Sequence, residues 1–378
     1  MRPPTPRPHV LLALLGDVTG SSRALRQLRA LAALGLRLAV VQVGAARRPG
    51  ALPADAALRA LPPPPGRGPA WFWAAHRAVR RAVIAEPAAL YLASDLYTLP
   101  ALAAAARRHG GRLVYDSREL YAALDSSAGR PLVSAAWRAV ERRHITRADA
   151  VLTVGDAIAD RLAAAYRIRR PLVLYNAPDA PTTPADRDAL RLLLGLPDDG
   201  RVVVLYQGLF REGRGLLALV GAAGAVDGVR LVLIGEGAAE AEVRRRGAGL
   251  GDRLVVHPFV PPDALAALTP GADVGACLIE PRTESLRLSL PNKLFEYLGA
   301  GLPVLASPLP EIRRAAAGAA VFADPADPGA VAGALRQLLD PDARRRLAAH
   351  SRAALGPYTW TRGRDAFQRL ILDLLPPE

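Results

Sequence analysis

The sequence contains very little lysine, cysteine or methionine. Lys293 is the only lysine, so 48 of the 49 basic residues are arginines. Cys277 is the only cysteine, which excludes an internal disulfide framework and a cysteine cluster for zinc or iron–sulfur ligation. It lies in the apolar run DVGACLI, where we expect a buried thiol. Such cysteine usage is typical of a reducing cytoplasm, and we expect a cytoplasmic protein.

Long apolar runs are also missing. The N-terminal stretch MRPPTPRPHVLLALLGDV has consecutive apolar residues only from Val10 to Leu15, too few for the core of a signal peptide. No run approaches the roughly 20 apolar residues of a membrane-spanning helix. The sequence predicts a soluble protein, which can still be peripheral at the inner face of the cell membrane.

Two common phosphate-binding motifs are absent as well. The first strand–helix turn reads GDVTGSSRAL and lacks GxGxxG, and no GxxxxGK[ST] occurs, which argues against a dehydrogenase or an NTPase. The six histidines show no ligand-type spacing. Asp186-Arg187-Asp188 mimics a metal-binding DxD but lies beside a proline-rich segment, away from any strand end. We therefore expect no metal site.

The net charge of +14 is confined to one half of the chain. Residues 1–180 hold 26 arginines against 12 acidic residues, whereas residues 181–378 hold 23 of each sign. A one-sided basic surface suits an anionic partner such as phospholipid, a lipid-linked phosphate or an acidic glycan. Nucleic acid is a weak candidate because the excess follows no recognisable module. A solvated basic face in an arginine-biased protein is the alternative.

The length favours two domains, since 378 residues exceed what one hydrophobic core usually supports. Short β-rich runs alternate with helical stretches such as SSRALRQLRALAALG, at HVLLALL, RLAVVQV, ALYLA, RLVYD and AVLTV. After residues 176–188, NAPDAPTTPADRD, the alternation restarts at RVVVLYQG, VRLVLIGEG, DRLVVHPF, ADVGACLI and LPVLAS. The pattern predicts two parallel, doubly wound α/β sheets with the proline-rich segment between them. Two such domains facing each other would form a cleft at the carboxyl ends of their strands.

Two strand–helix turns carry glycine and arginine together. In the first, Gly16 and Gly20 lead into a helix that begins near Ser21 and Arg23, where backbone N–H groups and the guanidinium can bind an anion. An ordinary serine N-cap with a solvated arginine is the alternative. In the second, YQGLFREGRGLLALV, Arg211 and Arg214 precede a helix, and arginine forks bind diphosphate oxygens in pairs.

The stretch SLPNKLFEYLGAGLPVLAS places the single lysine at a helix start. The free N–H groups of the helix KLFEYLGA can hold a second phosphate. Lys293 and Glu296, three residues apart, share roughly one face of it. A cation in the first turn opposes the helix dipole unless an anion lies in front of it. We therefore expect Lys293 to contact a phosphate; a chance lysine on a solvated face is the alternative.

The motifs YQGLFREGRGL, LIGEG, VHPFV and SLPNKLFEYLGAGLPVLAS, in this order, resemble the C-terminal half of family 4 (group 1) glycosyltransferases of the GT-B fold. The stretches SDLYTLPALAAAARRHGGRLVYDSRELY, ERRHITRADAVLTVGDAIADRL and YNAP resemble the same family's acceptor domain. The resemblance implies an acceptor-binding domain over residues 1–178, a nucleotide-sugar-binding domain over residues 179–356, and a C-terminal helix, residues 357–378, that packs back on the first domain.

The resemblance also implies roles for individual residues. Arg214 stands where the family usually has a lysine that grips the donor diphosphate, and Glu296 corresponds to the carboxylate that typically binds the ribose hydroxyls. Two oxygens of one carboxylate suit a vicinal diol. The other expected donor-binding residues are Gly16, Arg23, Gly208, Arg211, Gly235, Gly237, Phe259, Val260, Ser289, Leu290, Pro291, Asn292 and Lys293.

Several positions depart from the family pattern. Leu288 replaces the first glutamate of the family's paired motif and cannot hydrogen-bond the donor sugar. Leu209 replaces an arginine of the donor turn, although Arg211 is close enough to substitute. Ser94 and Arg118 stand where histidines are expected.

No catalytic base can be singled out from the sequence. The candidates for the catalytic or acceptor side are polar residues at strand ends of the first domain, namely Asp17, Asp95, Asp116, Arg118 and Glu119. A front-face retaining mechanism reduces the need for a base, because the departing phosphate oxygen can accept the proton.

The resemblance therefore implies a retaining glycosyltransferase that uses a UDP- or GDP-sugar and a glycan or lipid-linked acceptor. We expect such an enzyme to need no metal and no cofactor, since the nucleotide sugar is a co-substrate. An inactive binding or scaffold protein and a nucleotide-sugar epimerase are the alternatives.

The segment AWFWAAHRAVRRAVIAE has two interpretations. Phe72, Ala75, Val79 and Val83 can form a core stripe, as in an ordinary docked helix. Its tryptophans and arginines also fit an interfacial helix on anionic lipid.

Overall fold

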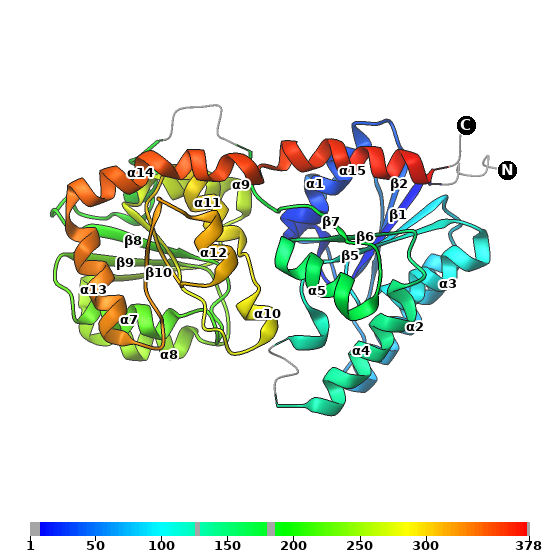
Figure 1. Cartoon of the computed structure of the whole chain (residues 1–378), viewed down its shortest axis with the longest axis horizontal. Helices are drawn as coiled ribbons and strands as arrows, with labels where there is room; N and C mark the ends of the chain where they lie inside the picture. The colour runs from blue at the N-terminus through cyan, green and yellow to red at the C-terminus, as the bar shows by residue number, and fades with distance from the viewer. Residues whose placement is uncertain (1–7, 125–128, 180–185, 376–378) are drawn as a thin grey trace. The chain divides into compact units, whose positions relative to one another are not determined.

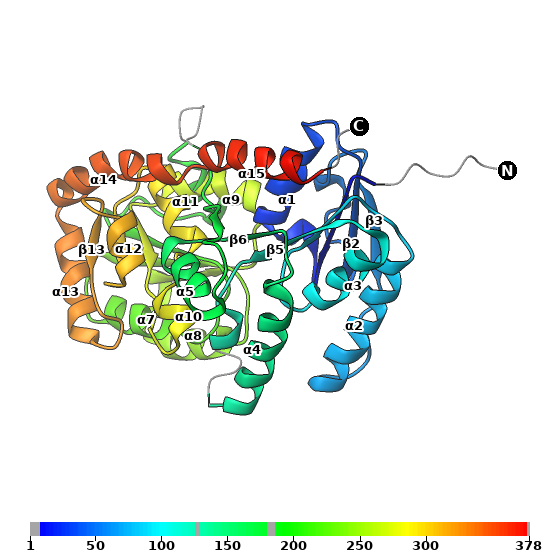
Figure 2. The ribbon, with the colours of Figure 1, turned by 45° about the vertical axis from the view of Figure 1, so that its right-hand side comes forward.

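The computed structural model describes residues 8–124, 129–179 and 186–375. The chain divides into two compact units, Met1–Asn176 with Thr361–Glu378, and Ala177–Trp360. We call them unit 1 and unit 2 (Figures 1 and 2). Of the predicted linker at 176–188, residues 180–185 lie outside the described residues.

Unit 1 is built on a seven-stranded sheet in the order β3-β2-β1-β4-β5-β6-β7, in which every pair is parallel. The strands are β1 (Val10–Leu14), β2 (Leu38–Val43), β3 (Ala57–Leu61), β4 (Leu90–Ala93), β5 (Arg112–Ser117), β6 (Ala150–Thr153) and β7 (Leu172–Val173). The helices are α1 (Ser22–Ala32), α2 (Pro69–Ile84), α3 (Leu99–His109), α4 (Pro131–Ile145), α5 (Asp156–Tyr166) and α15 (Trp360–Leu374), with 3-10 turns η1 (Val18–Gly20), η2 (Pro49–Ala51) and η3 (Tyr121–Ala123).

The helices of unit 1 follow from local signals. Ser21 caps α1, because its Oγ accepts a hydrogen bond from the Ala24 N–H at 3.3 Å. α3 ends at Gly110 in the left-handed conformation, φ +68°. α15 lies beside α1, where the Gln368 side chain donates to the Ala30 carbonyl oxygen at 2.7 Å (Figure 1).

Unit 2 is built on a six-stranded parallel sheet in the order β10-β9-β8-β11-β12-β13. The strands are β8 (Val202–Gln207), β9 (Val229–Ile234), β10 (Leu254–His257), β11 (Val274–Cys277), β12 (Val304–Ala306) and β13 (Ala320–Phe322). The helices are α6 (Ala189–Leu194), α7 (Leu216–Gly224), α8 (Glu240–Gly247), α9 (Pro262–Leu268), α10 (Glu284–Arg287), α11 (Asn292–Ala300), α12 (Pro310–Ala315), α13 (Pro328–Leu339) and α14 (Pro341–Leu355), with 3-10 turns η5 (Ala248–Arg253), η6 (Thr269–Gly271) and η7 (Gly356–Tyr358).

The central strands of both units are buried on both faces, which is why they read as continuous apolar runs. In unit 2 the side chains of β8 and β9 pack with those of α7 and α13, including Leu219 and Leu335. Removing this apolar surface from water stabilises the unit by roughly 25 cal/mol per Å². The two parallel, doubly wound sheets confirm the predicted fold class.

In each sheet the strand order reverses beside one strand, between β1 and β4 in unit 1 and between β8 and β11 in unit 2. Open α/β sheets bind ligands at the carboxyl ends of the strands at such a reversal. We therefore expect a ligand site at the residues that follow β8 and β11.

Among the described residues, no helix combines the length and the apolar composition needed to cross a bilayer.

Candidate functional site

The carboxyl end of β8 leads into a tightly fixed glycine turn. The Gly208 N–H donates to the Ile234 carbonyl oxygen at 2.9 Å, and the Phe210 N–H donates to that of Glu236 at 2.8 Å. The Tyr206 hydroxyl donates to the Leu209 carbonyl oxygen at 2.8 Å. The turn after β8 is therefore held against the turn after β9.

Gly235 and Gly237 make this close approach possible. A Cβ at Gly235 would lie 1.9 Å from the Gly208 carbonyl oxygen, and one at Gly237 would lie 2.3 Å from that of Phe210. Their φ angles of +153° and +152° are also rare for residues with a side chain. The packing of two backbone turns thus accounts for both glycines without a nucleotide, although they still border the predicted donor site.

Lys293 in the first turn of α11 carries the most unusual side chain of this edge. It is only 9% exposed, and its Nζ has no hydrogen-bond partner in the part of the chain that the structure describes. The Nζ lies 3.3 Å from the centre of the Tyr206 ring, and 3.6 Å from the place of a Cβ on Gly208. A desolvated ammonium over an aromatic face gains about 2 kcal/mol, less than its burial costs.

Burial lowers the pKa of Lys293 to about 7; the positive charges of Arg214 and Arg211 add to the effect, whereas Cys277 and Glu296 oppose it. Arg214 is half-buried and Arg211 is exposed, both in the turn between β8 and α7. Three cationic side chains thus lie near one strand end. Such a cluster favours an anion, because a bound anion would restore the charge of the lysine.

Two helices begin at this edge without a side-chain cap. Gly215, with φ +62°, precedes α7, and Pro291 precedes α11. The first N–H groups of an uncapped helix are hydrogen-bond donors without an intrahelical partner. They add to the positive potential that the cationic side chains produce.

Glu296 lies one turn after Lys293 on α11 and is bound to the end of β8. Its Oε2 accepts a hydrogen bond from the Gln207 side-chain amide. The Gln207 Oε1 in turn accepts one from the Thr269 hydroxyl at 3.1 Å, and the Gln207 N–H donates to the Tyr297 hydroxyl at 3.0 Å. This chain of bonds fixes the orientation of the carboxylate.

The other residues of unit 2 that are predicted to contact a donor lie in its turns or at the start of α11. Ser289 donates its hydroxyl to the Leu286 carbonyl oxygen at 2.7 Å, Leu290 is buried, and Asn292 is exposed. Phe259 is 44% exposed after β10, and Val260 is buried. Leu288 ends the short helix α10 and offers only an apolar side chain where the family has a carboxylate.

Arg23 does not fit the prediction that it binds an anion. It is 3% exposed, and its Nε and Nη2 donate to the two oxygens of Asp116 at 2.7 and 2.6 Å. Its remaining donors reach the carbonyl oxygens of Leu174 and Thr153. A guanidinium bound in this way ties α1 to β5, so this geometry contradicts a role for Arg23 in anion binding. Gly16, with φ +125°, lies before η1 in the same unit.

The candidate carboxylates of unit 1 are engaged with nearby backbone. Asp17 accepts hydrogen bonds from the Thr19 N–H and hydroxyl at 2.8 and 2.6 Å and from the Arg47 N–H at 3.1 Å, which together bring its pKa below the ordinary value although burial opposes this. Asp95 accepts from the Leu15 and Thr98 N–H groups at 2.6 and 2.7 Å. These bonds favour positioning roles over a catalytic base.

Arg118 and Glu119 follow β5. Arg118 Nη2 lies 3.9 Å from Asp95 Oδ2, and its Nη1 lies 3.4 Å from the Ser21 hydroxyl. Burial would lower the pKa of Arg118, but the hydroxyl oxygen of Tyr121 and the carboxylate of Asp95 raise it above the ordinary value. The Glu119 side chain is exposed. Ser94, in the place of a family histidine, is buried, and its hydroxyl has no partner among the described residues.

In the described ranges, no group of three or more His, Cys, Asp or Glu side chains is arranged to hold a metal ion. Asp186 instead accepts hydrogen bonds from the N–H groups of Asp188 and Ala189, at 2.9 and 3.2 Å, at the start of α6. Cys277 is buried, as predicted, and burial raises the pKa of its thiol to about 11.

Tyr206 and Gln207 also belong to the candidate donor site, although the sequence motifs do not predict them. Tyr206 supplies the ring beneath Lys293, and Gln207 orients Glu296. Their signal is the polar ending of the otherwise apolar run VVVLYQ at the carboxyl end of a strand.

The comparisons with known proteins agree with this architecture. Residues 19–178 match the family described as glycosyl transferase 4-like domain, and residues 201–341 match glycosyl transferases group 1. Sucrose-phosphate synthase from Thermosynechococcus elongatus superposes with a TM-score of 0.78 at 18% identity, over 96% of this chain and 98% of that one. The Anabaena protein HepE, solved in complex with UDP-glucose, gives a TM-score of 0.76 at 15% identity, over 96% and 99%.

One curated protein, 2-deoxystreptamine glucosyltransferase of Streptomyces kanamyceticus, is 30% identical over 187 residues, which are 47% of this chain and 46% of that protein. The match thus spans about half the length of that relative. The two doubly wound sheets and their structural neighbours define the GT-B architecture. With family matches over most of its length, the chain belongs to the group 1 glycosyltransferase family.

Proposed function

We propose that this glycosyltransferase moves a sugar from a UDP- or GDP-sugar to a glycan or lipid-linked acceptor, with retention at the anomeric carbon and without a bound metal or other cofactor. The observation that carries the proposal is the buried, unpartnered ammonium of Lys293 beside the glycine turn of β8. HepE, of the same fold, was solved with UDP-glucose, which supports a nucleotide-sugar donor.

In this proposal the donor diphosphate lies against Lys293, Arg214 and Arg211. Their positive charge stabilises the charge that develops on the diphosphate as the glycosidic bond to the nucleotide breaks. A diphosphate oxygen accepts the proton of the acceptor hydroxyl, so that no protein base is required. Glu296 holds the ribose hydroxyls, with its orientation set by Gln207.

The donor site is tested by calorimetric titration of UDP-glucose and GDP-mannose into Lys293→Ala and Glu296→Ala. We expect each variant to raise the Kd by roughly tenfold or more, since a hydrogen bond to a charged group contributes about 1.5–3 kcal/mol. Glu240→Ala, an exposed carboxylate on α8, is the matched control and should leave the Kd unchanged. Unchanged affinity in both site variants would overturn the assignment.

Turnover separates this proposal from its alternatives. The protein is incubated with a panel of nucleotide sugars, with and without lipid extracts, and the products are identified by mass spectrometry and by the anomeric configuration in NMR spectra. A glycosylated product of retained configuration supports the proposal. An epimerised nucleotide sugar without acceptor would indicate an epimerase, and binding without turnover would indicate a scaffold protein, the role that Leu288 and Ser94 favour.

We further propose that unit 1 meets an anionic membrane surface that carries the acceptor. Ala75, Val79 and Val83 of α2 are buried, while Trp73 is 62% exposed beneath the Arg77 guanidinium, 4.5 Å from its ring centre. Leu132 at the start of α4 is 84% exposed. Exposed apolar side chains among arginines suit an anionic lipid surface.

Sedimentation with phosphatidylglycerol vesicles at low salt tests the membrane proposal. We expect the wild-type protein to bind and Trp73→Ala with Leu132→Ala to bind several-fold more weakly, because both apolar contacts are lost. Leu192→Ala, a 77% exposed leucine of unit 2, is the control. A wild-type protein that ignores these vesicles would contradict the proposal.

A further inference from the structure

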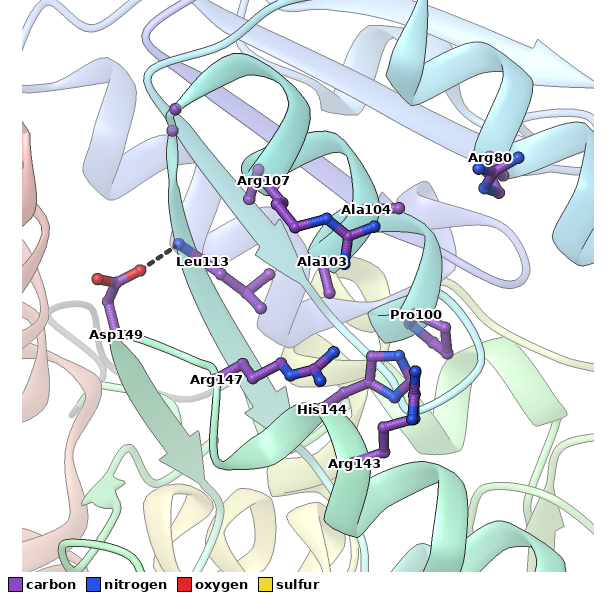
Figure 3. Close-up of a pocket in the computed structure, with 13 residues that line it drawn as sticks. Arg80, Pro100, Ala103, Ala104, Arg107, Leu113, Arg143, His144, Arg147 and Asp149 are labelled. Atoms are coloured by element: carbon purple, nitrogen blue, oxygen red, sulfur yellow. Dashed lines mark hydrogen bonds between the residues drawn. The ribbon is translucent and has the colours of Figure 1, made fainter.

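Unit 1 contains a pocket of about 730 Å³ at the amino edge of its sheet. Its walls are α3, the end of α4 and the turns that lead into β5 and β6, with Arg80 of α2 at its rim (Figure 3). Gly110, Gly111 and Asp149 line it where these strands begin, whereas Ser94 and Arg118 follow the opposite, carboxyl ends of β4 and β5. The pocket lining includes none of the candidate acceptor-side residues Asp17, Ser94, Asp95, Arg118 and Glu119, so the pocket is separate from them.

Four arginines from three different segments line the pocket. They are Arg80 of α2, Arg107 of α3, Arg143 of α4 and Arg147 just after α4. Figure 3 shows Arg107, Arg143 and Arg147 reaching into the same space. Over the described residues, none of the four guanidinium groups has an ion-pair or hydrogen-bond partner. Like charges that converge without a counter-charge repel one another, so this arrangement favours an anionic ligand.

The one carboxylate of the pocket does not neutralise these arginines. Asp149 accepts a hydrogen bond from the Leu113 N–H at 2.8 Å (Figure 3). Its other oxygen lies 3.0 Å from Arg112 Nη1. Arg112 does not line the pocket. Both oxygens of Asp149 are thus bound to residues at the start of β5. The carboxylate therefore does not pair with any of the four guanidinium groups of the pocket.

His144 also lines the pocket, and the positive charge of the arginines affects its pKa. Its Nδ1 lies 2.8 Å from the Val140 carbonyl oxygen. Burial lowers the pKa of His144, and Arg147, Arg143 and Arg107 lower it further, although the bond to Val140 opposes this. The ring is therefore a neutral side chain held among cations.

We propose that this pocket binds a phosphate group carried by a larger molecule, held by the forks of Arg107, Arg143 and Arg147. Guanidinium groups bind phosphate oxygens in bidentate pairs, and three of them match the oxygens of a phosphate monoester. The volume is within the range of about 300–1,000 Å³ that is typical of small-molecule sites and exceeds what a lone phosphate needs. The phosphate belongs either to a water-soluble phosphorylated compound or to a lipid headgroup.

Two double variants of equal charge test the site. Arg107→Gln with Arg143→Gln removes two pocket arginines, whereas Arg108→Gln with Arg142→Gln removes their neighbours on the same helices, which do not line the pocket. Both lose the same net charge, so a difference between them cannot come from the overall field. Far-UV circular dichroism and the melting temperature in chloride establish that both variants fold.

The soluble source is tested by titrating inorganic phosphate and glucose 6-phosphate against chloride of equal ionic strength. We expect these ligands to bind the wild-type protein and the Arg108/Arg142 variant alike, and the Arg107/Arg143 variant at least about tenfold more weakly. The lipid source is tested with vesicles of phosphatidic acid, a phosphate monoester, against phosphatidylglycerol, a diester. Loss of binding to phosphatidic acid vesicles in the Arg107/Arg143 variant alone would assign the site to a headgroup.

Equal behaviour of the two double variants in both arms would overturn the proposal. Its outcome is independent of the proposed donor site, because the Lys293→Ala protein should keep the phosphate binding that the Arg107/Arg143 variant loses. Conversely, the Arg107/Arg143 variant should bind UDP-glucose as the wild-type protein does.

Discussion

Lys293 combines burial, a missing hydrogen-bond partner and two nearby arginines, and each of these disfavours its charged form. Arginine, the residue that this chain uses elsewhere for positive charge, could not respond in the same way, because a guanidinium does not deprotonate in a protein. A compact ammonium in this position can lose its proton when the site is empty and regain it when an anion binds.

The affinity for UDP-glucose should therefore fall as the pH rises. The pKa of Lys293 in the free protein is lowered to about 7, so the ammonium is mostly charged at pH 6 and mostly neutral at pH 8. A diphosphate that binds the charged form should bind about tenfold more weakly at pH 8 than at pH 6. Calorimetry with UDP-glucose is suitable, because its diphosphate does not titrate in this range. Lys293→Met should bind weakly at both pH values; a slope that persists in this variant would assign the titration to another group.

The same lysine should destabilise the protein when no donor is bound. Its pKa in the folded state is below the ordinary value of 10.5, so the unfolded chain binds more protons between about pH 7 and pH 10.5, and stability rises with pH over this window. Lys293→Met should raise Tm at pH 6 by about 3 °C or more, and the gain should shrink towards pH 10. Differential scanning calorimetry measures this, with Arg287→Met on the exposed face of α10 as control. A lower Tm for Lys293→Met at pH 6 would contradict the buried, unpaired charge.

At the scale of the element, the site depends on how closely two turns approach each other. The turn after β8 and the turn after β9 are joined by backbone hydrogen bonds, and glycine at position 235 is what permits the contact. The same contact positions Gly208 beside Lys293. A side chain at position 235 should therefore disturb both stability and donor binding.

Gly235→Ala should lower the free energy of unfolding by about 2 kcal/mol or more, because its Cβ would lie 1.9 Å from the Gly208 carbonyl oxygen at a φ that alanine disfavours. Gly221→Ala, within α7 and with no atom within 4 Å of its Cβ, should instead gain roughly 0.5–1 kcal/mol. Urea denaturation followed by circular dichroism compares the two. Equal stability of Gly235→Ala and the wild-type protein would show that the turns separate easily.

The ten strands that the apolar runs predict are all present, and most of them, such as β1, β8 and β9, are buried on both faces and therefore read as continuous apolar runs. The sequence did not predict β3, β7 and β13. β3 lies at the edge of its sheet and contains Arg59, β7 has two residues, and β13 is an edge strand of three. Short edge strands carry too little buried surface to mark the sequence.

Residue types along one segment are enough to predict that Lys293 and Glu296 contact a donor, and this stays a prediction. The contacts of a side chain cannot be predicted from the sequence where the partner is distant along the chain. Arg23 was expected to bind an anion, but Asp116, 93 residues further on, occupies its guanidinium. Gln207 likewise reaches Glu296 across 89 residues. Side-chain pairs that are this far apart in the sequence are brought together by the order of the strands in the sheet. The hydrophobic pattern of a single segment does not determine that order.

At the scale of the whole molecule, the two halves of the chain differ in how they should respond to salt. The first 180 residues carry the entire net charge of +14, mostly on arginines that the structure leaves exposed on helices such as α2 and α4. Exposed charges are screened over a Debye length of about 10 Å at 0.1 M salt, whereas buried ones are screened much less. Lys293 belongs to the second kind.

Binding to phosphatidylglycerol vesicles should therefore weaken steeply with sodium chloride, while the Kd for UDP-glucose changes little over the same range. Each arginine near an anionic surface contributes about 1 kcal/mol, so several of them acting together should lose at least roughly tenfold in vesicle affinity between low and physiological salt. Vesicle sedimentation and calorimetry on one protein preparation give both curves. Vesicle binding that does not depend on salt, or that is as strong to phosphatidylcholine as to phosphatidylglycerol, would contradict a contribution of the arginines. The exposed side chains of Trp73 and Leu132 would then account for the binding. An equally steep loss of UDP-glucose affinity would mean instead that the donor is held by exposed arginines such as Arg211 rather than by the buried Lys293.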